Sequence, residues 1–384
     1  MPASHNPLFC IVPPYILRNI IEHGNPGQSA WAQKTLVQTN QVHDERSDIL
    51  DGKKQLVAKT AVPGEQRVVY DAQNGTALPG IAVRREGDPP VSDPAVNEAY
   101  DGAGLTYTFY SEVYSRNSMD NLGMRIDSTV HYDRSFDNAF WNGEQMVYGD
   151  GDEDLPEAER LFNRFTSSLD VIGHELTHGV IQYEANLVYA SQPGALNEHF
   201  ADVFGSLVKQ RSLGQTAAQA DWIIGAGIFT ANVNGVGVRS MKAPGTAYDD
   251  PVLGKDPQPA HMRDYVNTTQ DYGGVHINCG IPNLAFYRTA MELGGFAWEK
   301  AGQIWYTTLR KRITSTSSFQ QTANTLYTVA GELYGAGSLE QQAVANGWAF
   351  VGITVAGTEP NPEPEPEPEN PGCLSSVMQF LGFR

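Results

Sequence analysis

The chain has 384 residues, 41% of them hydrophobic, and a formal net charge of −18 at pH 7. This charge argues against nucleic acid and against an anionic membrane as partners, because both are bound by basic surfaces. The length allows two packed domains with appendages, and the three cysteines are too few and too scattered for a disulfide framework.

The first part of the chain is predicted to form short helices. Residues 12–17, with the sequence VPPYIL, precede a brief helix over residues 18–22, which residues 24–27 (GNPG) end. A second helical stretch is expected around residues 30–39. The charged segment that follows it, residues 44–48 (DERSD), is predicted to be soluble and suited to proteolytic nicking.

Residues 58–165 are predicted to form twisted antiparallel strands. Short runs there, such as residues 66–70, alternate apolar and polar side chains and are broken by Gly, Pro, Asn and Asp. From about residue 166 onward, longer segments with helical periodicity dominate, for example residues 319–334. We therefore expect an α+β fold, with a β-rich N-terminal domain and a mainly α-helical C-terminal domain.

The most informative motif lies in a helix expected to start after residues 166–168, which are good capping residues. It has the sequence HELTH, with His174 and His178 four residues apart and Glu175 between them. Positions i and i+4 share one helical face, so both imidazoles can bind one zinc ion, which lowers the pKa of its bound water to ~7. Glu175 can then accept the water's proton during attack on a carbonyl, which indicates hydrolysis.

A second helical stretch carries further candidates for this site. Glu198 and Asp202 lie four residues apart on one face, and Glu198 is the natural third ligand. Metal-bound histidines usually donate their other N–H to a carboxylate or carbonyl, so we expect Asp202 and Asn197 to orient the two histidines. His199 is a competing ligand, although it points about a quarter turn away from Glu198.

These motifs, together with Tyr189 and the runs at residues 137–143 (DNAFWNG) and 271–278 (DYGGVHIN), closely resemble the thermolysin-like neutral zinc metallopeptidases. The resemblance covers about residues 60–355 and involves several spaced motifs, which makes it very specific. It implies a two-domain peptidase with the zinc site in the cleft between the domains. Residues 12–17 resemble the short propeptide of the protealysin branch of this family.

The resemblance implies catalytic roles for four residues. Glu175 would be the general base and later the proton shuttle to the leaving amine. His276 and Tyr189 would stabilise the oxyanion of the tetrahedral intermediate, and Asp271 would hold His276 in its donor form. Cys10, close to the propeptide motif, could approach the zinc, but burial is its expected role.

The resemblance also implies how a substrate binds. Asn138 and the Ala139 backbone would hold an extended peptide by strand addition, and Arg239 would bind the carbonyl on the primed side, so the expected partners are protein or peptide substrates. An apolar primed-side pocket would favour cleavage on the amino side of Leu, Phe, Ile or Val. Its expected lining is Phe162, Phe165, Val171, Ile224, Ile228 and Val238.

The chain departs from the family pattern at its calcium sites. Two acidic positions match, whereas four others carry no carboxylate. The matches are Asp170 and Asp221; the departures are Lys209, Ile223, Ala226 and, at a second site, Val236. Calcium needs 6 to 8 oxygen ligands in general, and an ammonium group cannot supply one. We therefore expect about one zinc per chain and little or no calcium, with Lys209 supplying the charge of the missing ion.

We predict four parts of the chain. They are a short propeptide (1–57), a β-rich N-terminal catalytic subdomain (58–165), an α-helical C-terminal catalytic subdomain (166–356), and a Pro/Glu-rich linker with an apolar tail (357–384). The tail is far below the ~20 residues that span a bilayer. The chain is expected to be a zymogen whose propeptide is removed by cleavage between residues 48 and 58, where Leu56 and Val57 suit the apolar pocket.

Residues 1–24 lack the features of a secretory signal, so secretion by another route is expected, with a cytoplasmic location as the alternative. We expect a monomer. Two other functions stay open. One is a catalytically silent interaction protein, which would need neither Glu175 nor His276. The other is a hydrolase of non-peptide amides or esters, which a comparison of casein with small esters would separate from a peptidase.

Overall fold

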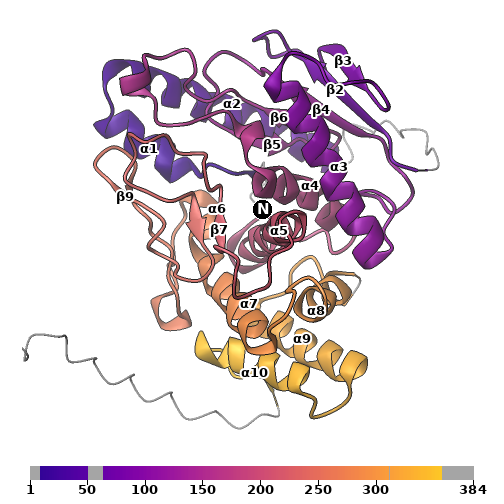
Figure 1. Cartoon of the computed structure of the whole chain (residues 1–384). Helices are drawn as coiled ribbons and strands as arrows, with labels where there is room; N and C mark the ends of the chain where they lie inside the picture. Colours follow the sequence, from indigo (N-terminus) through magenta and orange to yellow (C-terminus); the bar gives the residue numbers. More distant parts are fainter. Residues whose placement is uncertain (1–8, 51–63, 311, 357–384) are drawn as a thin grey trace, which may run out of the picture.

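The computed structural model describes residues 9–50, 64–310 and 312–356 (Figure 1). Strands gather in the N-terminal half of the chain and helices dominate the C-terminal half, so the predicted α+β fold is confirmed. Helices α4 and α5 cross the middle of the molecule between the two (Figure 1). The predicted segment boundaries stay predictions, and residues 51–63 and 357–384, with most of the predicted cleavage junction and the tail, lie outside the described residues.

A six-stranded sheet forms in the order β1-β5-β6-β4-β2-β3. Its strands are β1 (Phe9–Cys10), β2 (Arg67–Asp71), β3 (Ile81–Arg85), β4 (Ile126–Val130), β5 (Ala139–Trp141) and β6 (Met146–Tyr148). β4 pairs in parallel with both β2 and β6, whereas the other pairs are antiparallel. The expectation of antiparallel strands alone is therefore wrong, because the sheet is mixed.

The parallel pairing of β2 with β4 depends on a long helix that the alternation of residues did not reveal. A parallel connection needs a crossover, and α3 (Pro94–Tyr114) lies in the one between β2 and β4. Asp93 caps this helix with its side chain and Pro94 follows it, a signal that is readable in the sequence. Glycines inside α3 obscure its period, and Gly102 packs closely against α4, since a Cβ there would lie 2.4 Å from Ile172 Cδ1.

The described part of the C-terminal half contains seven α-helices, α4 to α10. They are α4 (Leu169–Tyr183), α5 (Ser191–Ser212), α6 (Asp271–Asn278), α7 (Gly280–Leu293), α8 (Lys300–Leu309), α9 (Phe319–Tyr334) and α10 (Leu339–Phe350). Short paired strands lie between α5 and α6: β7 (Ile223–Ile224) with β8 (Arg239–Ser240), and β9 (Asp249–Asp250) with β10 (Gly254–Lys255). The predicted helix over residues 319–334 is confirmed, and a capping box of Ser318 and Gln321 begins it.

The N-terminal segment forms two helices, α1 (Pro14–His23) and α2 (Pro26–Leu50). The second helix continues through residues 44–48, so the prediction of a charged segment beyond the helix is wrong there. Both helices contact the rest of the protein: Asn19 Nδ2 donates to Leu253 O at 2.8 Å, and Lys34 Nζ lies 2.7 Å from Asp133 Oδ1. Apolar residues of α1 also belong to the main hydrophobic core.

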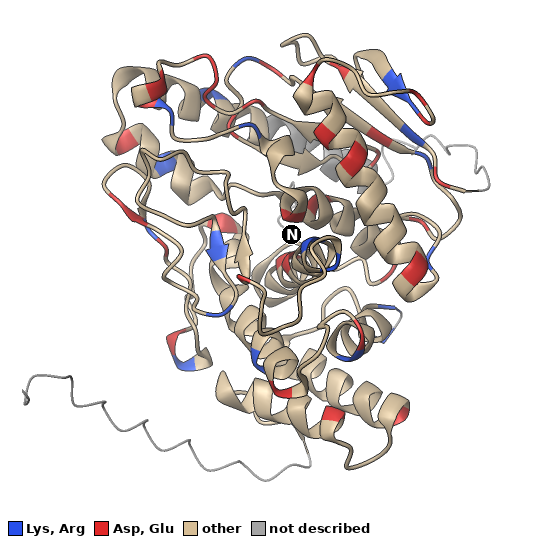
Figure 2. Cartoon of the chain, viewed as in Figure 1, with Lys and Arg blue, Asp and Glu red and all other residues tan. Residues whose placement is uncertain are grey.

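The distribution of charged residues along the fold agrees with the acidic composition. Lys and Arg are interspersed with more numerous Asp and Glu along the described part of the chain (Figure 2). None of the helices in the described ranges is long and apolar enough to cross a membrane.

Helices α4 and α5 approach each other closely at two glycines. Gly173 of α4 faces Gly205 of α5, so that a Cβ on Gly173 would lie 3.1 Å from Gly205 Cα. A Cβ on Gly205 would lie 2.4 Å from Asp170 O and 2.9 Å from His174 N. Because backbone atoms on both sides limit the space, only glycines allow this approach.

We predict that Gly205→Ala lowers the free energy of unfolding by about 3 kcal/mol, because the added methyl group forces two packed backbones apart. Chemical denaturation monitored by circular dichroism measures the loss. Ser212→Ala, at an exposed position near the end of the same helix, is the control and should leave stability almost unchanged. Equal stability of the two variants would contradict the tight contact.

An ionic contact joins the end of β4 to the start of α3. His131 lies 2.7 Å from Asp150 Oδ2 and 2.8 Å from Asp93 Oδ2. Its pKa is raised to about 9 by the hydrogen bond to Asp150, with Asp93 adding to the effect and partial burial opposing it. A raised pKa means that the stabilisation is complete below the unfolded value of 6.5 and is lost as the pH rises through about 9.

Stability as a function of pH therefore depends on His131. We expect His131→Gln to reduce the free energy of unfolding most below pH 6.5, and the difference from wild type to shrink as the pH approaches 9. Urea denaturation across this range measures it. His23→Gln, at an exposed residue of α1, is the control and should give a small difference that does not vary in this way. A constant difference for His131→Gln would contradict the assigned contact.

Candidate functional site

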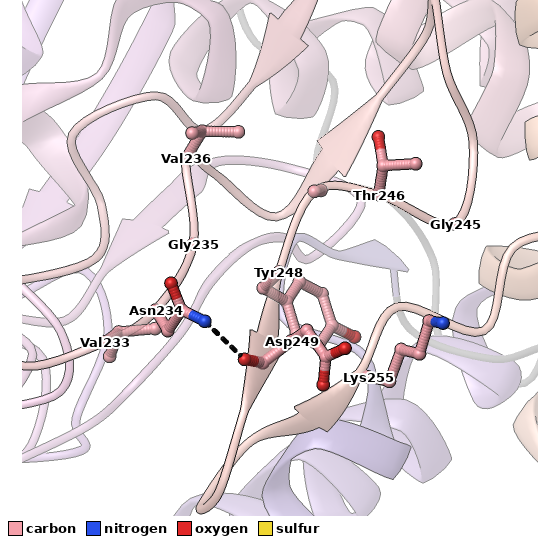
Figure 3. A pocket seen from close by; sticks show the side chains of 10 residues that line it. Val233, Asn234, Gly235, Val236, Gly245, Thr246, Tyr248, Asp249 and Lys255 are labelled. Carbon is pink, nitrogen blue, oxygen red and sulfur yellow. Dashed lines mark hydrogen bonds between the residues drawn. The ribbon is translucent and has the colours of Figure 1, made fainter.

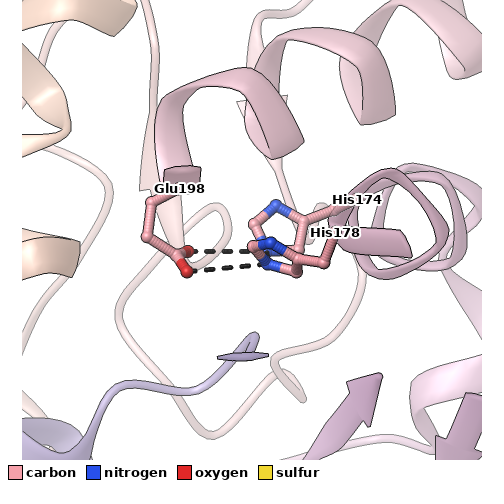
Figure 4. Close-up of side chains that lie close together, drawn as sticks. All are labelled: His174, His178 and Glu198. Carbon is pink, nitrogen blue, oxygen red and sulfur yellow. Dashed lines mark hydrogen bonds and ion pairs between the residues drawn. The ribbon is translucent and has the colours of Figure 1, made fainter. Parts of the chain in front are cut away.

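Three fully buried side chains from α4 and α5 converge on one point (Figure 4). His174 and His178 extend from one face of α4, and Glu198 faces them from α5. The two Nε2 atoms are 3.0 Å apart, and each lies 3.5 Å from an oxygen of Glu198. One ligand atom from each residue falls within 4.8 Å of the others, a group able to hold a metal ion.

The donor set fits zinc. His174 Nδ1 lies 2.9 Å from Asp202 Oδ1, and His178 Nδ1 lies 3.0 Å from Asn197 Oδ1. Both partners are acceptors, so each Nδ1 carries the proton and each Nε2 presents a lone pair. Two lone pairs and the carboxylate of Glu198 thus point at one another in a buried space, which a cation between them would reconcile.

His199, the competing ligand, lies outside this group. Its Nδ1 lies 2.8 Å from Asn283 Oδ1, and its Nε2 accepts from Trp305 Nε1 at 2.8 Å. Burial lowers its pKa to about 4, so the ring is neutral at physiological pH. It is a satisfied core histidine, as its orientation relative to Glu198 suggested.

Asp202 contacts more partners than the sequence indicated. Besides His174, its two oxygens accept from Arg239 Nη2 at 2.8 Å and Nε at 2.9 Å, and Oδ2 accepts from Asn283 Nδ2 at 2.8 Å. Burial alone would raise the pKa of Asp202, but Arg239 and His174 outweigh it and lower the pKa below its usual value. Asn283 lies far along the chain, and no local pattern in the sequence pointed to it.

Glu175 lies beside the metal ligands, fully buried, and its Oε2 accepts from Trp141 N at 3.1 Å. Trp141 belongs to β5, so a backbone amide of the sheet fixes the carboxylate against the cleft. Because Glu175 follows His174 directly, it points away from the ligand face and toward this strand.

His276, Asp271 and Tyr189 meet on the other side of the group. Asp271 Oδ1 lies 2.6 Å from His276 Nδ1, and its Oδ2 accepts from His276 N at 2.9 Å. Tyr189 Oη donates to Glu198 and lies 3.1 Å from His276 Nε2. Left-handed backbone at residues 271–274 makes the turn that brings Asp271 back onto His276, and glycine occupies two of these positions.

The titration behaviour of these groups suits hydrogen-bond donation. Burial lowers the pKa of His276, but Glu198 and Asp271 outweigh it and raise the pKa above its usual value. Burial also raises the pKa of Tyr189 well above 10, with Glu198 adding to the shift, so its hydroxyl keeps the proton.

Residues 10–12 lie in the cleft as an extended segment along β5. Ile11 N donates to Ala139 O at 3.3 Å, and Arg239 Nη1 donates to Ile11 O at 3.1 Å. Val12 N donates to Asn138 Oδ1 at 2.9 Å, and Asn138 Nδ2 donates to Val12 O at 3.1 Å. The structure thus brings Asn138, Ala139 and Arg239 onto one peptide, which is the chain's own. The sequence motif of residues 12–17 begins one residue after Ile11, which was not predicted to bind; its signal in the sequence is an apolar pair ahead of two prolines.

Cys10 is buried, and its carbonyl oxygen lies 3.0 Å from His276 Nε2. Its thiol donates to Val12 O at 3.5 Å and is not part of the metal-binding group. Burial raises the pKa of this thiol well above 9, and nearby carboxylates, Glu175 first, raise it further. The neutral, buried thiol agrees with the expected role.

All six residues expected to line the primed-side pocket are buried, with exposures of 0 to 1%. Phe162 stacks on Phe165, and a Cβ on Gly225 would meet Val238 and Ile228. Ile11 is likewise 0% exposed and belongs to the same hydrophobic core. The other two residues of the expected lining, Val171 and Ile224, lie in α4 and β7 within that core.

Lys209, which the resemblance places where a calcium ligand would stand, lies among oxygen atoms. Its Nζ lies 2.8 Å from Asp170 Oδ2, 3.1 Å from Asp221 Oδ1, and 2.8 Å from Ile223 O. Burial lowers the pKa of Lys209, but Asp170 and Asp221 outweigh it and raise the pKa above its usual value. The ammonium group therefore stays charged among the oxygens, and the expectation of little or no calcium stays a prediction.

A separate cavity of about 490 Å³ lies beside β9 and β10 (Figure 3). Its lining includes Val236, Tyr248 and Lys255, and Asn234 Nδ2 donates to Asp249 O across it at 2.8 Å. None of the residues expected to be catalytic or to bind substrate lines this cavity.

Two models of known protein families together match most of the chain. The model described as "Thermolysin metallopeptidase, catalytic domain" matches residues 31–182, and "Thermolysin metallopeptidase, alpha-helical domain" matches residues 185–353. An "Extracellular metalloprotease" of Pectobacterium carotovorum subsp. carotovorum is 51% identical over 303 residues, 79% of this chain and 84% of that protein. "Protease PrtS" of Photorhabdus sp. (strain Az29) is 45% identical and covers 92% of this chain and 95% of its own.

A solved structure is similar over nearly the whole chain. The precursor of protealysin, a metalloproteinase from Serratia proteamaculans, is 49% identical, with a TM-score of 0.81, and the match covers 90% of this chain and 100% of that one. With the two family models, it confirms the resemblance seen in the sequence. The chain therefore belongs to the thermolysin metallopeptidase family and is a zinc metalloendopeptidase made as a precursor with an N-terminal propeptide.

Proposed function

We propose that this enzyme cleaves peptide bonds on the amino side of hydrophobic residues and that residues 10–12 keep its precursor latent. One observation carries the proposal. The chain's own extended segment contacts Asn138, Ala139 and Arg239, the residues expected to hold a peptide substrate. A protein that binds an extended peptide beside a His, His, Glu metal group has the arrangement needed for peptide hydrolysis.

The proposed roles follow from the contacts. Glu175, held by Trp141 N, accepts the proton of the attacking water and later passes it to the leaving amine. His276 and Tyr189 donate to the oxyanion as it forms, and Asp271 fixes the His276 ring. When zinc is bound by His174, His178 and Glu198, it supplies Lewis-acid activation of water and of the carbonyl.

The proposed specificity rests on the apolar pocket. Phe162, Phe165, Val171, Ile224, Ile228 and Val238 form its lining. Each methylene buried there contributes ~0.8 kcal/mol, so Leu, Ile, Val and Phe are favoured over smaller or polar side chains. Ile11, the aliphatic residue of the bound segment that bonds to Ala139, is buried.

We propose that the protein acts outside the cell as a monomer. The Pectobacterium relative is named an extracellular metalloprotease, and we extend that location to this chain. A precursor whose cleft is filled by its own propeptide cannot digest the proteins of the producing cell, which fits activation after export.

The first test concerns the general base. Glu175→Gln should keep zinc, because Glu175 is not a ligand, yet lose about 10²- to 10⁴-fold in kcat on casein. The precursor of this variant should also keep its propeptide, whereas wild type loses about 50 to 57 residues on standing. Elemental analysis measures the zinc content, a casein assay measures kcat, and mass spectrometry shows whether the propeptide is kept.

Glu332→Gln, at an exposed residue of α9, is the control and should behave as wild type. Small esters assayed in parallel separate a peptidase from an esterase. Casein cleavage by zinc-loaded Glu175→Gln at the wild-type rate would falsify the assigned role.

The second test concerns the ion balance at Lys209. Wild type should contain about one zinc and far less than one calcium per chain. Lys209→Met should lower the free energy of unfolding by roughly 3 kcal/mol, because it leaves Asp170 buried without a counter-charge. Lys300→Met, which removes the ion pair between the exposed Lys300 side chain and Glu340, is the control and should cost little. Calcium that survives dialysis of wild type would contradict the role of Lys209.

A further inference from the structure

The segment that fills the cleft has the register of a substrate about one particular peptide bond. On the carbonyl side of that bond, Cys10 O accepts from His276 Nε2 at 3.0 Å. On the amide side, Ile11 N donates to Ala139 O at 3.3 Å. The bond between Cys10 and Ile11 therefore lies between the group proposed to stabilise the oxyanion and the strand proposed to hold the primed residues.

The residues that follow keep the same register. Ile11 O accepts from Arg239, and both backbone groups of Val12 bond to the Asn138 side chain. β1 also pairs antiparallel with β5, with Cys10 opposite Phe140. Five hydrogen bonds thus fix both the direction and the position of the segment, and a shift by one residue would break this match.

The side chains agree with this register. Ile11, the residue after the bond, is 0% exposed and aliphatic, as expected for the apolar pocket. Glu175 is held by Trp141 N, the amide next to Phe140, so the proposed base lies at the level of the bond. Reacting groups held in this way need little further rearrangement.

We infer that the Cys10–Ile11 bond is a processing site that the enzyme cuts within its own precursor. The inference rests on the proposed function. Water adds across the bond, so that Cys10 gains a carboxylate and Ile11 an amine, which receives the proton through Glu175. No other reactant is needed.

This cut differs from the one that removes the propeptide. After it, the segment from Ile11 onward is still held by Arg239 and Asn138 in the cleft, and farther along by Asn19 on Leu253 and Lys34 on Asp133. The primed side of the cleft therefore stays filled. The clipped precursor remains latent until the chain is also cut between residues 48 and 58 and the helices dissociate.

Mass spectrometry of the intact precursor tests the inference in the full chain. Zinc-loaded wild type should lose residues 1–10 and show a new N-terminus at Ile11, ahead of the appearance of casein activity. Glu175→Gln precursor made in the same way should keep the Cys10–Ile11 bond. A new N-terminus at Ile11 in both proteins would indicate a foreign protease and overturn the inference.

A peptide of residues 6–17 tests the same bond without any folding problem. Wild-type enzyme that has lost its propeptide should cut it between Cys10 and Ile11. The Ile11→Asp peptide should be cut at least about 100-fold more slowly, because a carboxylate must enter the apolar pocket. The Asn6→Asp peptide carries the same added charge four residues before Cys10 and should be cut at the normal rate.

Two outcomes distinguish the inference from the proposed function. If the processed enzyme cuts casein but leaves both the precursor bond and the peptide intact, or cuts the peptide elsewhere, the inference is wrong and the proposed function stands. If casein itself is not cut, the proposed function fails and the inference fails with it.

Discussion

A single buried carboxylate, Asp202, connects the metal ligands to the substrate side of the cleft. It contacts His174 Nδ1 and receives two hydrogen bonds from Arg239, which in turn donates to the carbonyl of Ile11. All three side chains are fully buried, so loss of the carboxylate would leave a guanidinium uncompensated and a ligand histidine without its orienting partner. The geometry of metal binding and the geometry of peptide binding are therefore set together.

That connection depends on how closely two helices approach. Asp202 can reach His174 only because α4 and α5 cross where Gly173 and Gly205 face each other. The same crossing brings Glu198 opposite the two histidines. A packing constraint between backbones thus determines the chemistry, and Lys209 beside Asp170 stabilises the start of α4 from outside.

The sequence predicted the centre of the site well because its signals are local. Spacing along one helix decides that His174 and His178 share a face, and the same rule placed Glu198 and Asp202 together. Features that depend on distant pairing were missed. The contacts of Ile11 with Ala139 and Arg239 join segments more than a hundred residues apart, and the parallel pairing of the sheet depends on α3, whose Gly102 packs against Ile172 of α4. The length of α2 was underestimated, because its charged final turns carry little apolar periodicity.

The residues proposed to bind substrate, Asn138, Ala139 and Arg239, also hold the propeptide, so other contacts must favour the propeptide over a substrate. The hydrogen bonds in the cleft contribute about 0.5–1.5 kcal/mol each, and any substrate can make them. α1 adds contacts that a substrate lacks: Ile16, Leu17 and Ile20 are buried in the main core, and each such side chain contributes ~1.5–3 kcal/mol. Most of the advantage of the propeptide over a competing substrate therefore comes from the packing of its helices. A cut in the chain, whether at Cys10–Ile11 or beyond α2, leaves that packing intact, so activation requires the helices themselves to leave the surface.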